Sequence, residues 1–416
     1  MKINLSEFWI SNYRSCVRTR FVPDPDLSCL IGYNGSGKSN ILNAILLLRS
    51  LPESRSIFRR RDSSYSRCRI KATFNYGRKR IYLRTGLLFV TTEYGSEELT
   101  PYHTEWNFRE FNRPDKWVEL PFGLGDPSYL FQHNLRIVRR TRVRTGRMLR
   151  WRSASDVLNK SEVAAIADIG QFLGGMSYYG ASQFTNPAKC PTSFEYDEER
   201  PHRPSIMRSE HGKFMIDLYL AFLARNERTD YEEFFNLVGP EGLRLVDQIH
   251  FKDYGLPESR LRVGAGGKVI RQEIRRRLIV PSVVTDRARL SPSQLSEGTF
   301  KTLALIFYLV SDKSRLLLIE EPEVCVHHGL LTRILALIRS YSRSKQIIFS
   351  THSDFVLDEL EPENVFLVKR PPGGGTLVRA VSQAMSKRDF RALKNYLGAA
   401  GNLGEFWRHG GFETHN

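Results

Sequence analysis

The feature of this sequence that most constrains its fold is the stretch GYNGSGKS, from Gly32 to Ser39, which fits the pattern G-x-x-x-x-G-K-[ST]. The apolar run Leu27–Ile31 before it predicts a buried strand, and Lys38–Leu51 after it predicts a central helix. A glycine-rich turn between a strand and a helix lets backbone N–H groups surround phosphates closely, and the helix N-terminus adds positive potential. A glycine loop that fits the pattern by chance is the alternative, which the two correct flanks disfavour.

This loop predicts a site for a nucleoside triphosphate. Lys38 would reach the outer phosphates, and the Ser39 hydroxyl would ligate Mg²⁺. We expect the nucleotide contacts to come from the loop and the first helical turn, at Gly32, Asn34, Gly35, Ser36, Gly37, Lys38, Ser39 and Asn40.

A second apolar run, Leu316–Ile319, ends in two carboxylates, Glu320 and Glu321. A metal-linked carboxylate and a water-activating base belong at the carboxyl edge of a parallel sheet. Glu320 is therefore expected to face Mg²⁺ through water, and Glu321 to orient or deprotonate the attacking water. An ordinary acidic loop after a buried strand would look the same when taken alone.

A third apolar run, Gln346–Phe349, is followed by Ser350, Thr351 and His352. A histidine at a strand end can donate to a γ-phosphate or hold the attacking water, although many such histidines are structural. The predicted catalytic residues are therefore Glu321, His352 and Glu320, and the predicted metal-binding side chains include Ser39 and Glu320.

The stretch SQLSEGT, from Ser293 to Thr299, stands before a long apolar helical pattern. Ser296, Glu297, Gly298 and the following amides form a helix start that can bind an anion. Because the glycine loop already holds one nucleotide, we expect this second helix start to cap the γ-phosphate bound by another copy of the protein. Two subunits arranged head to tail would then complete each other's sites.

The chain is strongly basic, with a formal net charge of +17, which favours a polyanionic partner over a mere surplus of solubilising charge. Arg136–Arg152 holds eight arginines and no acid. Smaller clusters lie at Arg59–Arg61 and Arg275–Arg277. A solvated charged face, or a surface for an acidic protein, is the alternative. We expect contacts with DNA or RNA at Arg136, Arg139, Arg140, Arg142, Arg144 and Arg147.

The five cysteines are odd in number and widely spaced, and they form no C-x-x-C, which predicts reduced thiols. The start of the chain, MKINLSEFWI, lacks the apolar core of a signal peptide, and no apolar run approaches the length that spans a bilayer. We expect a cytoplasmic protein with no membrane partner.

In this order, GYNGSGKS, LSEGT, LLLIEEPE and FSTHS resemble the Walker A, signature, Walker B and switch-histidine motifs of ABC-type ATPases. The form is similar to RecF/SMC-like and OLD-like bacterial ATPases of the AAA family, rather than to membrane transporters. Asn12-Tyr13-Arg14-Ser15 resembles the N-F-R-S that precedes Walker A in these proteins, which implies that Arg14 approaches the nucleotide.

The sequence departs from the family pattern in two places. Glu320-Glu321 replaces the usual Asp-Glu, and His328 replaces a proline beside the D-loop. The glutamine that senses the γ-phosphate and the metal is expected at Gln183, with Gln132 as the second choice. The stretch after Ser353 is too short for the Toprim nuclease domain of OLD proteins, so none is expected.

The expected fold class is α/β: an ABC ATPase head with a P-loop parallel sheet, an N-terminal antiparallel β subdomain and an inserted, mainly helical lobe. The expected boundaries place the N-terminal lobe of the head at 1–126, the basic inserted lobe at 127–277 and the C-terminal lobe at 278–416. Helical patterns at Ala154–Leu173 and Met207–Leu237 characterise the insert.

The resemblance implies an ATP- and Mg²⁺-dependent ATPase that acts as a dimeric switch, in a homodimer or a higher homo-oligomer of head-to-tail dimers. The resemblance to OLD-like ATPases that lack a nuclease domain implies that the protein is the sensor subunit of a bacterial anti-phage system. It would act with a separate nuclease or toxin. One alternative is a RecF-like, ATP-dependent DNA repair factor. Another is an ATP-bound scaffold with little turnover that sequesters a partner protein.

Overall fold

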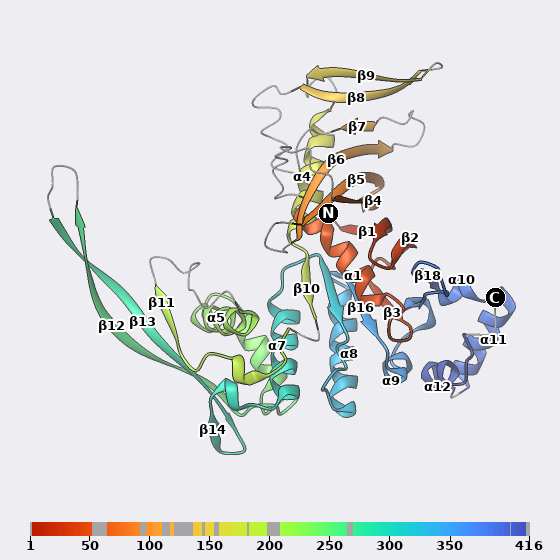
Figure 1. The fold of residues 1–416 in the computed structure, drawn as a ribbon. Helices are drawn as coiled ribbons and strands as arrows, with labels where there is room; N and C mark the ends of the chain where they lie inside the picture. Colours follow the sequence, from red (N-terminus) through yellow and green to blue (C-terminus); the bar gives the residue numbers. More distant parts are fainter. Residues whose placement is uncertain are drawn as a thin grey trace. The chain divides into compact units, whose positions relative to one another are not determined.

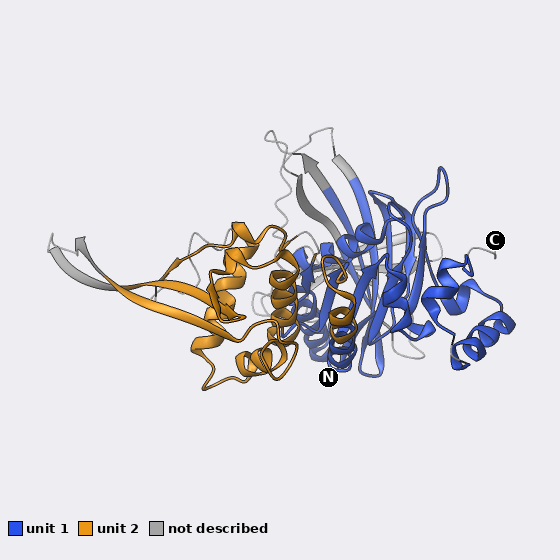
Figure 2. Cartoon of the chain, turned by 90° about the horizontal axis from the view of Figure 1, so that it is seen from below, with its two compact units in different colours: residues 1–179, 313–321, 335–416 blue, residues 180–312, 322–334 orange. Residues whose placement is uncertain are grey.

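The computed structural model describes residues 2–51, 65–91, 97–109, 117–119, 136–143, 146–153, 158–180, 183–197, 209–263, 269–399 and 401–412. The chain forms two compact units (Figure 2). Unit 1 comprises Met1–Tyr179, Lys313–Glu321 and Leu335–Asn416, and unit 2 comprises Gly180–Asp312 and Pro322–Ile334. The lobe boundaries expected at 126/127 and 277/278 thus differ from the division between the units, which falls first at Tyr179/Gly180.

Unit 1 contains a six-stranded sheet in the order β10-β15-β16-β3-β17-β18 (Figure 1). Its strands are β3 (Leu27–Ile31), β10 (Ser177–Tyr179), β15 (Leu316–Glu320), β16 (Gln346–Thr351), β17 (Val365–Lys369) and β18 (Leu377–Ala380). Strands β10, β15, β16, β3 and β17 are parallel to one another, and β18 pairs antiparallel with β17. The central strands are buried along nearly their whole length, as their continuous apolar runs predict.

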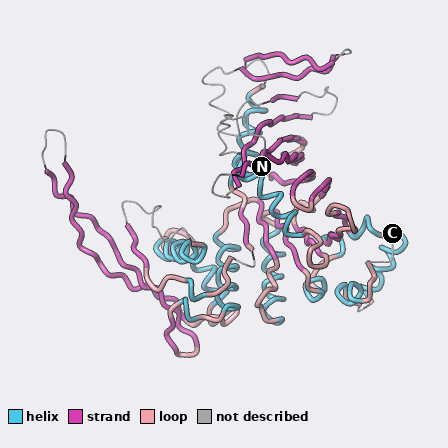
Figure 3. Tube along the Cα trace, viewed as in Figure 1, coloured by secondary structure: helices cyan, strands magenta, loops and turns pink. Residues whose placement is uncertain are grey.

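A second sheet of unit 1 is antiparallel and has the order β2-β1-β4-β5-β6-β7-β8-β9 (Figure 3). Its strands are β1 (Ile3–Tyr13), β2 (Cys16–Phe21), β4 (Tyr65–Tyr76), β5 (Lys79–Thr91), β6 (Glu97–Arg109), β7 (Trp117–Glu119), β8 (Arg136–Val143) and β9 (Gly146–Ser153). The arginine-rich stretch, expected in the inserted lobe, therefore forms the last hairpin of this sheet, because its alternating sequence suits a strand.

Helix α1 (Lys38–Leu46) contacts β15 and β16 of the parallel sheet and β1 of the antiparallel sheet. Its buried residues, including Ile41 and Ile45, belong to one apolar core with both sheets and α4 (Lys160–Gly174). The 3₁₀ turn η1 (Leu47–Ser50) continues α1. The pattern predicted as one helix at Lys38–Leu51 is thus an α-helix that ends in a tighter turn.

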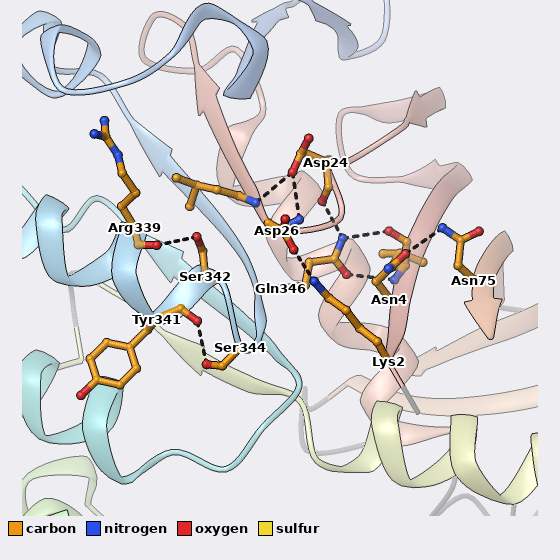
Figure 4. Close-up of polar contacts among 12 residues, drawn as sticks. Lys2, Asn4, Asp24, Asp26, Asn75, Arg339, Tyr341, Ser342, Ser344 and Gln346 are labelled. Carbon is orange, nitrogen blue, oxygen red and sulfur yellow. Dashed lines mark hydrogen bonds and ion pairs between the residues drawn. The ribbon is translucent and has the colours of Figure 1, made fainter. Parts of the chain in front are cut away.

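A buried glutamine connects the two sheets (Figure 4). The side-chain amide of Gln346, at the start of β16, donates to Leu5 O at 2.9 Å and to Asp24 O at 2.8 Å. Its Oε1 accepts a hydrogen bond from Leu5 N at 2.9 Å. One side chain thus satisfies both backbone groups of a residue in β1 and one carbonyl in the turn before β3.

The C-terminal part of unit 1 adds the end of α8 (His328–Ser342) and four further helices. These are α9 (Asp354–Asp358), α10 (Val381–Ala384), α11 (Lys387–Gly398) and α12 (Leu403–Arg408), together with the 3₁₀ turn η6 (Pro362–Asn364). Helix α12 lies against α9, where Gly404 N donates to Asp358 Oδ1 at 2.7 Å and Arg408 pairs with Asp354 at 2.7 Å. The C-terminal segment is thereby joined to the helix that follows His352.

Unit 2 combines helices with a small antiparallel sheet. Its helices are α5 (Glu210–Leu223), α6 (Asp230–Val238), α7 (Glu297–Ser311) and the start of α8, with 3₁₀ turns η2 (Pro187–Lys189) and η5 (Pro292–Gln294). Its strands are β11 (Phe194–Asp197), β12 (Gln248–Val263), β13 (Val269–Thr285) and β14 (Ala288–Leu290). Aromatic rings of Phe184, Phe214 and Phe300 pack together in its core.

The predicted α/β fold class is confirmed: the protein has a parallel P-loop sheet and an antiparallel β-sheet. The helical pattern at Ala154–Leu173 corresponds to α4, which begins at Lys160 after the Asn159 cap. The pattern at Met207–Leu237 forms two helices, α5 and α6. In the part of the chain that the structure describes, no helix has both the length and the apolar character needed to cross a membrane.

Candidate functional site

The glycine loop lies between β3 and α1, as its sequence predicts. Gly35 and Gly37 have φ angles of +79° and +107°, in the region that favours glycine. A Cβ atom at Gly37 would also lie 2.1 Å from Thr376 Oγ1. Gly37 is therefore required both by its backbone conformation and by close packing.

The first turn of α1 is suited to an anion. Its N-cap is Gly37, no side chain caps it, and its first turn holds no acid, so the first amides lack intrahelical partners. Lys38 is 5% exposed and its Nζ donates to Gly32 O at 2.7 Å and Tyr33 O at 3.3 Å. Ser36 Oγ is buried and has no hydrogen-bond partner among the described residues. This donor set fits a triphosphate.

A chain of polar side chains supports the loop from the β1–β2 turn. Asn40 Nδ2 donates to Ser15 Oγ at 2.7 Å, and Ser15 Oγ lies 2.8 Å from Thr376 Oγ1. Thr376 Oγ1 donates to Ser36 O at 3.1 Å. Arg14, with a φ of +49°, lies in the same turn, and its Nη1 is 3.5 Å from Asn40 Oδ1. Arg14 and Asn40 are thus brought together beside the loop, and the Asn40 amide is engaged with protein groups.

Glu320 ends β15, two strands from β3, and Glu321 follows it directly. Glu320, Ser350 and Leu30 are cross-strand neighbours in β15, β16 and β3. Tyr178 of β10 donates its hydroxyl hydrogen bond to Glu320 Oε2. Burial, and then this hydrogen bond, raise the pKa of Tyr178 above its usual value, so the hydroxyl keeps its proton. One oxygen of Glu320 is thus held by a neighbouring strand.

Glu321 and His352 lie together at adjacent strand ends. Glu321 N donates to Ser350 O at 3.0 Å, and Glu321 has a left-handed φ of +46°. His352 Nδ1 is 3.4 Å from Glu321 Oε1, and the two side chains are 45% and 26% exposed. The structure therefore brings a carboxylate and an imidazole together within reach of solvent, at the edge of the sheet that carries the glycine loop.

The signature stretch lies in unit 2, at the start of α7. Ser296 Oγ accepts from Thr299 N at 3.1 Å, which is an ordinary N-cap. Glu297 Oε1 pairs with Lys301 Nζ at 3.0 Å, and the hydrogen bond from Lys301 lowers the pKa of the Glu297 carboxyl. Ser296 and Glu297 are therefore engaged with their own helix in this structure.

Gly298 is required by its close contact with Cys325, in the segment between β15 and α8. A Cβ atom at Gly298 would lie 2.2 Å from Cys325 O. Cys325 itself has a φ of +65°, and its Sγ lies 3.6 Å from Glu297 Oε1 and 3.8 Å from Lys301 Nζ. The start of α7 and the segment after Walker B are thus fitted closely together within unit 2.

Gln183, the expected sensor glutamine, follows β10. Its Oε1 accepts from Gly180 N at 2.9 Å, and its own N donates to Gly180 O at 3.0 Å, which makes a tight turn. The second choice, Gln132, lies outside the described residues. Among the residues that the structure describes, no group of three or more His, Cys, Asp or Glu side chains could hold a metal ion.

The predicted nucleic-acid residues Arg136, Arg139, Arg140, Arg142 and Arg147 lie on the strands of the β8–β9 hairpin, and Arg144 lies outside the described residues. The cluster Arg59–Arg61 also lies outside them. Of the third cluster, Arg276 is 3.4 Å from Glu195 and Arg277 is 2.7 Å from Asp253. Those two charges are thus paired with acids of unit 2.

Sequence reasoning missed three side chains of this site: Tyr178, Ser15 and Thr376. Tyr178 is the middle residue of a three-residue strand, β10, whose neighbour could be identified only once the sheet order was known. Ser15 stands in the N-Y-R-S stretch, which could have marked it, whereas Thr376 has no sequence signal because its partners are far away along the chain.

Residues 193–358 match the family described as "AAA domain, putative AbiEii toxin, Type IV TA system". The match covers less than half of the chain and includes the signature, the carboxylates and His352. Among curated proteins, no sequence is similar enough to count as a match.

Solved structures of SMC heads show a distant likeness. The Smc head bound to the C-winged helix domain of ScpA is 14% identical with a TM-score of 0.45, over 92% of this chain and 99% of that one. The SMC head domain from Thermotoga maritima is 13% identical with a TM-score of 0.41, over 91% and 99%. The Smc head with an extended coiled coil, bound to the C-terminal domain of ScpA derived from Pyrococcus furiosus, is 12% identical with a TM-score of 0.43, over 95% and 100%. Likeness at this level supports no statement about partners.

The family match lies after the glycine loop in the sequence and includes the ends of β15 and β16. The glycine loop, the paired carboxylates and the histidine stand at neighbouring strand ends of one parallel sheet. The carboxylates and the histidine therefore belong to the segment that matches an AAA domain, and the glycine loop lies at the same edge of the sheet.

Proposed function

We propose that this protein binds and hydrolyses ATP and works as a dimeric switch. The observation that carries the proposal is the meeting of Glu321 and His352, 3.4 Å apart, at strand ends beside the glycine loop. Phosphoryl transfer to water needs mainly positioned groups and neutralised charge, which such a sheet edge can supply.

Different residues of unit 1 would bind the phosphates and the metal. The amides of the loop and Lys38 bind the phosphates, and Ser39 and Glu320 are the side chains that would hold Mg²⁺. When bound, Mg²⁺ would neutralise charge on the outer phosphates. Tyr178 keeps the Glu320 carboxylate in one orientation through its hydrogen bond. Arg14, held beside Asn40, adds positive charge next to the loop.

Glu321 is the proposed base. Its carboxylate would accept a hydrogen bond from the attacking water, and His352 would restrain the same water or the γ-phosphate from the other side. The left-handed backbone at Glu321 is uncommon for a residue with a side chain, and such conformations cluster at functional sites.

The proposed dimer is head to tail. Ser296, Gly298 and the first amides of α7 in one copy would cap the γ-phosphate held by the other copy. The Ser296 hydroxyl now accepts from Thr299 N, so an incoming phosphate would compete with this cap. Gln183, which now closes a turn on Gly180, would likewise have to turn toward the phosphate and the metal.

Glu321→Gln tests the base assignment. It should lower turnover by about 10²–10⁴-fold while ATP binding is retained, because the amide cannot accept the proton. Glu361→Gln is the matched control, since Glu361 is exposed at the start of η6. Hydrolysis by the Glu321 variant at the parental rate would refute the assignment.

A mixing experiment tests the shared site. Lys38→Ala and Ser296→Arg should each abolish turnover alone. When the two proteins are mixed, a heterodimer contains one site with both residues intact, so part of the activity should return. Failure of every mixture to regain activity, with dimers present by mass, would contradict the head-to-tail arrangement.

We further propose that the switch is the sensor subunit of a bacterial anti-phage system with a separate nuclease or toxin. The matching family's description names a toxin of a Type IV TA system, which is consistent with a defence context. Purification from the native operon, with the mass of the assembly measured with and without ATP, tests this. Recovery of the ATPase alone under both conditions would argue against a separate effector.

A further inference from the structure

We propose that the outward face of the antiparallel sheet in unit 1, over β2, β1, β4 and β5, binds single-stranded nucleic acid. This surface, here called the basic sheet face, is separate from the β8–β9 hairpin and from the nucleotide site. Its cations include Arg18, Arg20, Arg69, Lys71 and Arg84, and its aromatic side chains include Trp9 and Tyr82.

The strand register places these residues in rows. Arg20, Trp9, Lys71 and Arg84 are successive cross-strand partners from β2 to β5, a row about 14 Å long at the usual strand spacing. Arg18, Ser11 and Arg69 form the next row. All five cations are exposed. The sheet thus presents its positive charges side by side, although they come from four segments of the chain.

The opposite side of the same strands is apolar, so this face cannot turn inward. Phe8, Ile70 and Leu83 alternate with the residues of the face and are at most 1% exposed. Side chains in a strand point alternately to the two faces. Burial of the apolar side in the core of unit 1 therefore fixes the basic side toward solvent.

Two carboxylates offset part of the positive charge of the basic sheet face. Glu7 pairs with Arg20 at 2.7 Å, and the buried Glu105 of β6 stands opposite Arg84 in the register. Cations still outnumber carboxylates on this face. Arg69 and Lys71 lie on β4, between the strands that carry Trp9 and Tyr82, and rings among cations favour a nucleic acid over an acidic peptide.

Binding of single-stranded nucleic acid requires aromatic rings for base stacking as well as positive charge, and this face has both. A shallow cavity of about 190 Å³ is lined by Glu7, Trp9, Lys71, Thr73, Tyr82 and Arg84. Lys71 Nζ lies 4.4 Å from the centre of the Trp9 ring. Trp9 and Tyr82 are only half-buried, so a ring can be reached when Lys71 turns to a phosphate. Unpaired bases stack on such rings, whereas the faces of paired bases are covered in a duplex.

Binding of a fluorescent oligo-dT to the full-length protein without ATP tests the proposal. Trp9→Ala should weaken binding about 10-fold or more, and Trp9→Phe should restore most of the loss, because phenylalanine can still stack. The triple variant Arg18→Gln, Arg69→Gln, Lys71→Gln should reduce the slope of log K against log salt by about 2, at about 0.7 per lost phosphate contact.

Arg391→Gln, an exposed cation on α11, is the control for each charge change. ATP binding and the melting temperature should match those of the parent, which shows that the variants fold. Unchanged affinity in both Trp9→Ala and the triple variant would overturn the proposal, as would equal affinity for a duplex of the same length. Since ATP is absent, this result does not depend on the proposed hydrolysis.

Discussion

Tyr178 and Glu320 are joined by a hydrogen bond from the phenolic hydroxyl to the carboxylate, although 142 residues separate them. The contact follows from the parallel pairing of β10 with β15, in which Tyr178 is the partner of Leu318. A carboxylate that is held in this way is ready to face a metal in one orientation only. Groups behind a metal ligand often determine how well it binds.

Replacement of Tyr178 by phenylalanine should therefore change the dependence on Mg²⁺ more than the binding of nucleotide itself. We expect the Mg²⁺ concentration for half-maximal ATP turnover to rise about 10-fold. The affinity for a fluorescent ATP analogue in EDTA should stay the same, whereas its enhancement by Mg²⁺ should diminish.

Tyr76→Phe provides the matched control for Tyr178→Phe. Tyr76 also donates to a carboxylate, Asp168 Oδ2 at 2.6 Å, and this hydrogen bond raises the pKa of Tyr76 to about 12. It joins β4 to α4, away from the strand ends of the parallel sheet. A similar Mg²⁺ shift in both variants would show that the effect is a general loss of stability.

Gln346→Leu should destabilise unit 1 without touching the nucleotide site. The change removes the partners of Leu5 N, Leu5 O and Asp24 O, and leaves buried polar groups without hydrogen bonds. We expect a loss of about 3 kcal/mol in the free energy of unfolding, measured by denaturant titration. Gln171→Leu, on the exposed side of α4, should change it little.

Local sequence patterns were enough to predict the elements that carry the nucleotide chemistry. The glycine loop, the runs that became β3, β15 and β16, and the residues at their ends all have signatures within a few positions. The side chains that support them do not, because Thr376 and Ser15 are 361 residues apart in sequence. Such pairs depend on sheet order, which a single sequence does not state.

The start of α7 shows a different limit. The start of α7 indicates both an anion site and an ordinary helix cap, since the Ser296 hydroxyl and the first backbone N–H groups can serve either purpose. The structure has the cap formed, with Ser296 bonded to Thr299. A second copy with bound nucleotide would favour the other arrangement, because a phosphate would compete with Thr299 N for the helix start.

Gly298→Ala should disrupt the contact between the start of α7 and Cys325. Alanine normally favours a helix over glycine by about 1 kcal/mol, but its Cβ would lie 2.2 Å from Cys325 O, so we expect a net loss of about 1–3 kcal/mol. Gly398→Ala, at the end of α11 with nothing within 4 Å of the added Cβ, should be neutral or stabilising. An equal change in the free energy of unfolding for the two variants would show that the segment around Cys325 moves away from the added Cβ at no energetic cost.

Asp217→Asn should stabilise unit 2 at neutral pH. Burial raises the pKa of the Asp217 carboxyl, more than its hydrogen bond from Tyr308 at 3.1 Å lowers it. A carboxyl whose folded pKa is raised favours folding below its unfolded pKa of about 3.9, and this contribution is lost as pH rises through the folded value.

Asparagine cannot ionise and can still accept from Tyr308, so the variant should have the higher free energy of unfolding at pH 7. The difference should shrink as the pH falls through the raised folded pKa toward the unfolded value of about 3.9, because the aspartate becomes protonated in the folded state. Asp247→Asn, at an exposed position, should show no such trend. A constant difference between Asp217→Asn and the parent across this range, measured by denaturant titration, would mean that ionisation of Asp217 costs the fold nothing.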